Sequence, residues 1–158
     1  MKFEGDIPDC ITPDTPVRFK PNGRWSFPDR MGVGGYSGFV YIIRDRYMKR
    51  FYLGKKFYEG RSALSTDWKT YLSSGATMKL MLAERPEEDF DYICLEQYTF
   101  RGSVSYAETW SLVTVGAALS ETWYNKRIEE VTWNVKEAPT DRHKDRLQRV
   151  IAGEKFEE

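Results

Sequence analysis

In the middle of the chain, two apolar segments separated by a polar one predict a β-hairpin. Residues 38–43 are mostly β-branched or aromatic, and residues 50–54 have a similar composition. The polar residues 44–49 form the turn between them, so the two strands are expected to pair in antiparallel fashion. Residues 90–100 contain a further apolar segment of this kind and predict a third strand.

Three other segments have helical composition and helix-like boundaries: residues 77–85, 103–120 and 140–152. The first ends before Pro86, and the last lies between Pro139 and Gly153, residue types that commonly flank helices. A shorter helix is expected to begin near Asp67 and to carry Trp68. The layout predicts a small α/β fold in which a short antiparallel sheet is covered by helices.

Residues 1–37 differ from the rest of the chain, because they hold five of its seven prolines. A segment so rich in proline is expected to form an irregular N-terminal arm. We therefore divide the chain into this arm, a folded unit at residues 38–135 and a C-terminal helix at residues 136–158.

Composition limits the class of protein. No apolar run approaches the roughly 20 residues that a membrane-spanning helix needs, so no membrane association is expected. The first residues lack the apolar core of a secretory signal. The two cysteines, Cys10 and Cys94, are too few for a disulfide framework, and we expect them to be reduced thiols. The sequence thus predicts a cytoplasmic protein.

The charges are balanced overall but not along the chain. The formal net charge is zero. Residues 38–71 contain eight basic and three acidic side chains, whereas residues 84–108 contain two basic and seven acidic ones. Either this is ordinary solvated surface, or one basic face meets phosphate and an acidic face does not.

Elimination narrows the chemistry that the chain can perform. The only histidine, His143, lies in the charged C-terminal helix, which excludes histidine zinc sites, histidine-based nuclease motifs and serine–histidine triads. The phosphate-loop signature and the dinucleotide-binding glycine fingerprint are also missing. Any catalysis therefore has to use tyrosine, lysine, arginine and carboxylate side chains together with a hard metal ion.

The hairpin carries a resemblance to a known family. Val40-Tyr41 and Tyr52-Leu53-Gly54 resemble the two half-motifs that name the GIY-YIG endonucleases, and two lysines follow at once, as in many phage-encoded members. Residues 67–74 resemble a second block of those phage proteins. Farther along, Glu108 is similar to the metal-binding glutamate of the family, and residues 123–125 match its late asparagine. The resemblance spans residues 38–125.

The chain departs from the family pattern at three positions. Phe39 stands between the glycine and the rest of the first half-motif, and Leu72 replaces a usual glycine. The family usually has an arginine on the first helix after the hairpin, where this chain has Asp67. The candidates for that arginine's role are Lys56, Arg61 and Lys69, of which we rank the first two ahead.

The resemblance implies a GIY-YIG nuclease-like fold and metal-dependent hydrolysis of DNA. The catalytic residues that it implies are Tyr41, Tyr52, Lys56, Arg61, Glu108 and Asn125. Glu108 would hold one Mg²⁺ or Mn²⁺ ion, Tyr41 would accept a proton from the attacking water, and Tyr52 would position that water. Lys56 or Arg61 would stabilise charge on the phosphate, and Asn125 would orient its neighbours.

The resemblance also implies DNA contacts and a location. Lys55 and Lys69 are the expected DNA-binding side chains. A phage-encoded member would act in the cytoplasm of the host. The sequence leaves open the oligomeric state and whether another protein targets the enzyme.

Each site residue also has a structural interpretation. Ser105 and Glu108 match a helix-capping box, which needs no function. Tyr41 and Tyr52 are of a type that packs well in strands, and Asn125 is of a type that often ends a turn. The alternative function is therefore a nuclease-like module without catalytic activity that binds DNA or assembles with proteins.

Overall fold

The computed structural model describes residues 21–59, 67–71, 75–126 and 135–158. Its sheet has three strands in the order β2-β1-β3: β1 (Gly38–Asp45), β2 (Arg50–Phe57) and β3 (Phe90–Tyr98). Both neighbouring pairs are antiparallel, which confirms the predicted hairpin and the third strand. Within the described ranges, no helix combines the length and the apolar character needed to cross a membrane.

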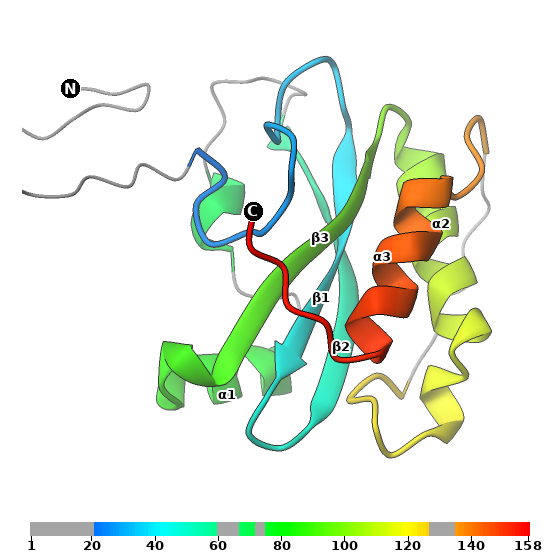
Figure 1. The fold of residues 1–158 in the computed structure, drawn as a ribbon. Helices are drawn as coiled ribbons and strands as arrows, with labels where there is room; N and C mark the ends of the chain where they lie inside the picture. Colours follow the sequence, from blue (N-terminus) through cyan, green and yellow to red (C-terminus); the bar gives the residue numbers. More distant parts are fainter. Residues whose placement is uncertain (1–20, 60–66, 72–74, 127–134) are drawn as a thin grey trace, which may run out of the picture.

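In the described ranges, three α-helices and three short 3₁₀ helices accompany the sheet: α1 (Ala76–Glu84), α2 (Arg101–Thr114), α3 (Asp141–Ile151), η2 (Asp67–Thr70), η3 (Glu87–Asp89) and η4 (Ala117–Leu119). Figure 1 shows α2 and α3 side by side on one face of the sheet, whereas α1 lies on the other side. The fold is therefore the predicted antiparallel sheet covered by helices.

The boundaries of α2 correct one prediction. We expected a helix over residues 103–120, but α2 starts at Arg101 and ends at Thr114. Gly116 then adopts a left-handed backbone with a φ of 65°, which stops the helix and leads into η4. The residue that caps α2 is Phe100, so Ser105 lies inside the helix and the predicted capping box with Glu108 does not exist. Glu108 needs another explanation.

The sheet separates two apolar cores. Alternate side chains of β1 point to opposite faces, so Phe39, Tyr41 and Ile43 enter one core while Val40 and Ile42 enter the other. We call these two sides the tyrosine face and the helix face. The helix face is covered by apolar side chains of α2 and α3.

The segment at residues 21–37, assigned to the irregular arm, contributes to the tyrosine face. It has no helix and only an isolated bridge between Ser26 and Ile93. Nevertheless Trp25, Phe27 and Met31 are buried in the core of that face. Residues 1–20 lie outside the described part, and the division into domains stays a prediction.

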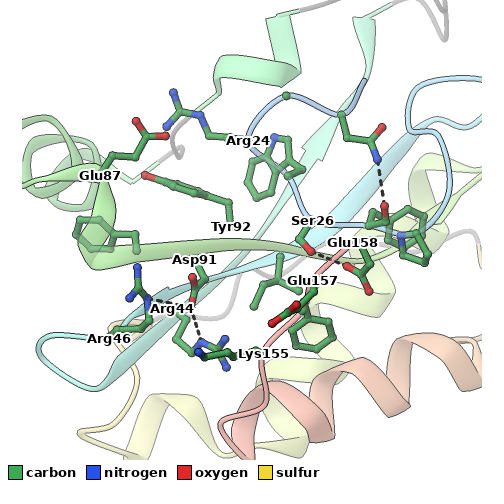
Figure 2. A pocket seen from close by; sticks show the side chains of 18 of the residues that line it. Arg24, Ser26, Arg44, Arg46, Glu87, Asp91, Tyr92, Lys155, Glu157 and Glu158 are labelled. Carbon is green, nitrogen blue, oxygen red and sulfur yellow. Dashed lines mark hydrogen bonds and ion pairs between the residues drawn. The ribbon is translucent and has the colours of Figure 1, made fainter. Parts of the chain in front are cut away.

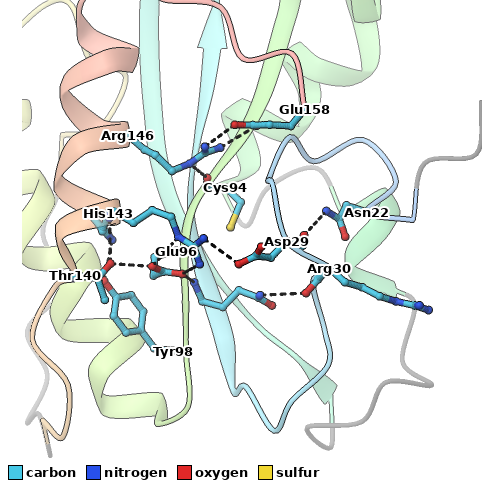
Figure 3. A network of polar contacts seen from close by, with 12 residues as sticks. Asn22, Asp29, Arg30, Cys94, Glu96, Tyr98, Thr140, His143, Arg146 and Glu158 are labelled. Carbon is cyan, nitrogen blue, oxygen red and sulfur yellow. Dashed lines mark hydrogen bonds and ion pairs between the residues drawn. The ribbon is translucent and has the colours of Figure 1, made fainter.

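Two arginines of α3 connect this segment and the C-terminal residues to the sheet (Figure 3). Arg142 pairs with Glu96 on β3 at 3.0 Å and with Asp29 of the N-terminal segment at 2.9 Å. Arg146 pairs with Glu158 at 2.7 Å. These ion pairs hold α3 against the β3 edge, on the side of the sheet away from β2.

His143 is buried in α3 and satisfied by hydrogen bonds. The backbone N–H of Thr140 donates to the Tyr98 oxygen, and the Tyr98 hydroxyl donates to Nδ1 of His143 at 3.0 Å. The Ser111 hydroxyl donates to the Ala107 carbonyl, so the Ser111 oxygen accepts from Nε2 of His143 at 2.7 Å. This chain of bonds requires a neutral imidazole protonated on Nε2.

The burial of His143 makes stability depend on pH. Burial lowers the pKa of His143 from 6.5 to about 3. Between these values the unfolded chain binds a proton that the folded chain does not, so the free energy of unfolding falls as the pH drops below 6.5. We expect a loss of about 2 kcal/mol between pH 7.5 and pH 5 in urea unfolding. His143→Gln should lose clearly less over the same interval, and equal losses would contradict the assignment.

Candidate active site

Tyr41 and Gly54 face each other across the hairpin. The register pairs them directly, and the Tyr41 ring lies over the glycine. A Cβ atom at Gly54 would lie 2.5 Å from the phenol oxygen and 2.7 Å from the ring carbon that bears it. Any side chain at this position would therefore collide with the phenol. Gly54, the glycine of the second half-motif, therefore leaves space for the Tyr41 side chain of the first half-motif to lie over β2.

The two tyrosines lie on the same face of adjacent antiparallel strands, as the hairpin predicts. Their ring centroids are 6.4 Å apart. Tyr41 is fully buried and also packs against Trp25 at 4.9 Å and Tyr71 at 5.9 Å. Tyr52 is half-buried at the rim of this aromatic cluster. The hairpin spacing and the motif order predict that both phenols open into one cleft that also contains Glu108. That prediction is wrong, because Tyr41 lies within the core and Glu108 lies on the other side of the sheet.

Glu108 and Lys55 form an ion pair on the helix face. The Lys55 ammonium lies 3.4 Å from the Glu108 carboxylate, and each side chain is 17% exposed. The register places Lys55 opposite Val40, whose side chain belongs to the helix-face core. Glu108 therefore approaches β2 from the side opposite to Tyr41. The two parts of the predicted site flank the same edge strand, at Gly54 and at Lys55.

The other predicted basic residues lie on the tyrosine face or outside the described residues. Lys56 pairs with Asp67 at 2.9 Å and lies 4.9 Å from the Tyr71 ring centroid. Lys69 is half-buried, with its ammonium 5.7 Å from the Trp68 ring centroid. Arg61 lies outside the described residues. Lys56 is thus the basic candidate that the structure brings closest to the aromatic cluster.

Asn125 clamps the outer edge of β2. Its side-chain oxygen accepts from the Leu53 N–H at 2.9 Å, and its side-chain nitrogen donates to the Leu53 carbonyl at 2.8 Å. Just before it, Thr122 and Tyr124 make backbone hydrogen bonds with Phe51. The amide group therefore continues the pairing of the edge strand. This fixes the strand between Tyr52 and Gly54.

Comparison with protein families decides the identity of this arrangement. The model of a family described as putative endonuclease segE, GIY-YIG domain, matches residues 25–128, about two thirds of the chain. The chain belongs to the GIY-YIG endonuclease family. The match confirms the resemblance and the phage segE type. No curated protein and no solved structure matches the chain.

Membership defines the reaction class. GIY-YIG domains are endonucleases, which hydrolyse phosphodiester bonds, and a nuclease domain implies a DNA substrate. The family match begins at Trp25, so it includes the part of the N-terminal segment that packs on the tyrosine face. The matched range thus begins before the hairpin.

The carboxylates of the domain suit a metal site with a single protein ligand. In the described part of the chain, no three histidine, cysteine, aspartate or glutamate side chains gather in one place. Mg²⁺ commonly keeps several waters and uses one or two carboxylates together with substrate phosphates. Glu108, half-buried and facing a cation, fits that kind of site.

A broad pocket lies elsewhere in the domain. It is lined by residues 21–30, by parts of all three strands, and by residues 153 and 155–158 (Figure 2). Six basic and six acidic side chains line it, so their charges cancel. Neither the predicted tyrosines nor Glu108 lines this pocket. A polyanionic substrate has no electrostatic reason to prefer it.

One residue that sequence reasoning did not select lies two turns before Glu108 on α2. Arg101, the first residue of α2, places its guanidinium 3.8 Å from the ring centroid of Phe57 on β2. It precedes Glu108 by seven residues, which is two turns of a helix, so both lie on the same side of α2. The seven-residue spacing could have indicated that Arg101 and Glu108 share one side of a helix. The predicted helix began at residue 103, however, so it did not include Arg101.

Proposed function

We propose that this GIY-YIG domain is a catalytically active, metal-dependent DNA endonuclease. One observation carries the proposal. The Tyr41 phenol and the Lys55–Glu108 pair approach neighbouring residues of β2 from its two faces. A phosphate at this edge of the sheet would lie next to the Glu108 carboxylate and the Lys55 ammonium, and the buried Tyr41 phenol would act on it only after the aromatic cluster opens.

Glu108 is the residue that would hold the divalent ion, either Mg²⁺ or Mn²⁺. The ion, when bound, supplies Lewis-acid stabilisation of the phosphate and of the leaving 3′ oxygen. Lys55 now neutralises the carboxylate. Ligation would release this ammonium from Glu108, and the charge would then be available to DNA phosphate.

The tyrosines would handle the attacking water. Tyr41 accepts its proton, directly or through a second water, and the half-buried Tyr52 orients it. A tyrosine in water has a pKa of about 10, so a base at neutral pH needs a nearby cation. Lys56 lies on the same face as Tyr41 and could supply that cation. Arg61 is the other candidate, both for this cation and for stabilising the charge that develops on the phosphate. Asn125 holds the strand that carries Tyr52.

A second candidate function is a DNA-binding module that has lost catalysis. Two observations favour it: Tyr41 is fully buried, and Lys56 is neutralised by Asp67, which stands where the family usually has arginine. In the inactive module, the aromatic cluster around Tyr41 would only contribute to the hydrophobic core. The two proposals differ in a single measurable property, which is cleavage.

Cleavage of supercoiled plasmid tests the choice. The protein is expected to cut with Mg²⁺ or Mn²⁺ and to be inactive in EDTA. Tyr41→Phe removes only the hydroxyl, so it should fold normally and cut at least about 100-fold more slowly, the low end for loss of a general base. Tyr52→Phe should lower the cleavage rate by a smaller factor than Tyr41→Phe does. No cutting by the wild type with any divalent ion would favour the inactive module, and full activity of Tyr41→Phe would remove Tyr41 from the mechanism.

Two further predictions accompany this function. We propose that the enzyme acts in the cytoplasm, that of the host for a phage-encoded nuclease. We also propose that target choice depends on another protein. Size measurements and co-purification from infected cells test these points.

A further inference from the structure

Arg101 is distinguished from the other basic side chains of β2 and α2 by its contacts. Lys55 and Lys56 pair with carboxylates, and Arg50 donates a hydrogen bond to the Glu121 carbonyl. Within these two elements, Arg101 contacts only the ring of Phe57. It is also exposed to solvent. Among the described residues, no hydrogen bond or ion pair takes up its five N–H donors.

Fold stability does not explain an arginine at this position. A cation over an exposed aromatic ring contributes about 0.5–1 kcal/mol. A positive charge in the first turn of a helix is disfavoured by the helix dipole by about 0.3–1 kcal/mol. The two effects nearly cancel, and α2 has no acidic residue in its first turn to offset the charge. An uncharged apolar residue would cover Phe57 as well.

The surroundings of Arg101 explain it better. Its guanidinium and the Lys55 ammonium share the Phe57 ring, at 3.8 Å and 5.7 Å from the centroid. Lys55 in turn contacts Glu108. The two cations thus share one aromatic ring of β2, and one of them also contacts the carboxylate of α2. A solvent-exposed guanidinium that is positioned over a ring can bind phosphate through two hydrogen bonds.

We propose that Arg101 binds a backbone phosphate of the DNA next to the one that is cleaved. It would supply, from the start of α2, a cation that the chain lacks at Asp67. This inference rests on the proposed function for the position of the scissile phosphate. The binding itself does not require cleavage, so the two can fail separately.

The test is duplex DNA binding in EDTA at several salt concentrations, with the full chain. Arg101→Met removes the charge but keeps an apolar cover on Phe57, whereas Arg101→Lys keeps the charge. Lys144→Met is the matched control, because Lys144 is also exposed and lies 5.6 Å from the ring centroid of Trp110, elsewhere on α2. Thermal melts establish that each variant is folded.

We expect Arg101→Met to weaken binding about tenfold and to lower the slope of log K against log salt by about 0.9, the value for one lost phosphate contact. Arg101→Lys should recover the slope, and Lys144→Met should match the wild type. Unchanged affinity and slope in Arg101→Met, or equal losses in the methionine and lysine variants, would overturn the inference, as would a wild type that binds no duplex at low salt. Plasmid cleavage, measured in parallel, reports on the proposed function alone.

Discussion

Replacing Glu108 by glutamine is expected to abolish metal-dependent cleavage while leaving the fold intact. A neutral amide binds Mg²⁺ far more weakly than a carboxylate does. Loss of the ion removes several kcal/mol of transition-state stabilisation, so the cleavage rate should fall by about a thousandfold or more. The folded state loses a partly buried ion pair with Lys55, which costs about 1 kcal/mol. Plasmid cleavage and thermal melts of the same preparation measure both effects.

Glu96→Gln is the control for this experiment. Glu96 is buried on β3, the far edge strand of the sheet, and also pairs with a basic side chain, Arg142. Its replacement should lower stability but leave the cleavage rate of the folded protein unchanged. Full cutting by a well-folded Glu108→Gln protein would take the glutamate out of the mechanism. Equal losses of activity in both variants would mean that only folding had been disturbed.

Placing a methyl group at Gly54 is expected to damage both stability and activity. In Gly54→Ala the new atom would lie 2.5 Å from the phenol oxygen of Tyr41, a distance that packed atoms do not tolerate. The ring has to move, at a cost of about 1–3 kcal/mol for an overpacked core. A displacement of about 1 Å at a reacting group can slow catalysis about 100-fold, and we expect a loss of that size.

Gly75→Ala is the matched control for Gly54→Ala. A Cβ atom at Gly75 would lie 3.5 Å from the Tyr52 oxygen, which is an ordinary contact, and the backbone φ of −81° suits any residue. The free energy of unfolding of the Gly75→Ala protein should differ from that of the wild type by less than about 0.5 kcal/mol. If Gly54→Ala destabilises the fold but the folded protein cuts at the normal rate, the Tyr41 phenol does not act in the reaction. If Gly54→Ala changes neither the stability nor the cleavage rate, the Tyr41 ring does not lie as close to Gly54 as the structure shows.

Secondary structure was predictable because it depends on neighbours in the sequence. The β-branched and aromatic residues of β1 and β2 alternate between faces, and a polar turn separates them. The last helix was predictable for the same reason: Thr140 caps its start and accepts from the His143 N–H, and Gly153 follows its end. The order of motif residues then indicated the family.

The start of α2 was not predictable in this way. Phe100 caps the helix without a side-chain hydrogen bond, so no capping residue marks the position in the sequence. The motif formed by Ser105 and Glu108 imitates a helix start, although both residues lie inside α2. Placing the start of α2 correctly leaves Glu108 without a capping role and brings Arg101 into the first turn.

The sequence by itself determined the strands, most of the helices, the residue types available for chemistry and the family. Tertiary structure alone decided which faces those residues occupy. Consecutive residues of a strand point to opposite sides, so Gly54 and Lys55 serve Tyr41 and Glu108 across the same strand. Likewise, long-range packing decided that Trp25 and His143 are buried, because their contacts come from segments far away in the chain. Local patterns cannot encode such contacts, which arise only when the sheet is covered on both sides.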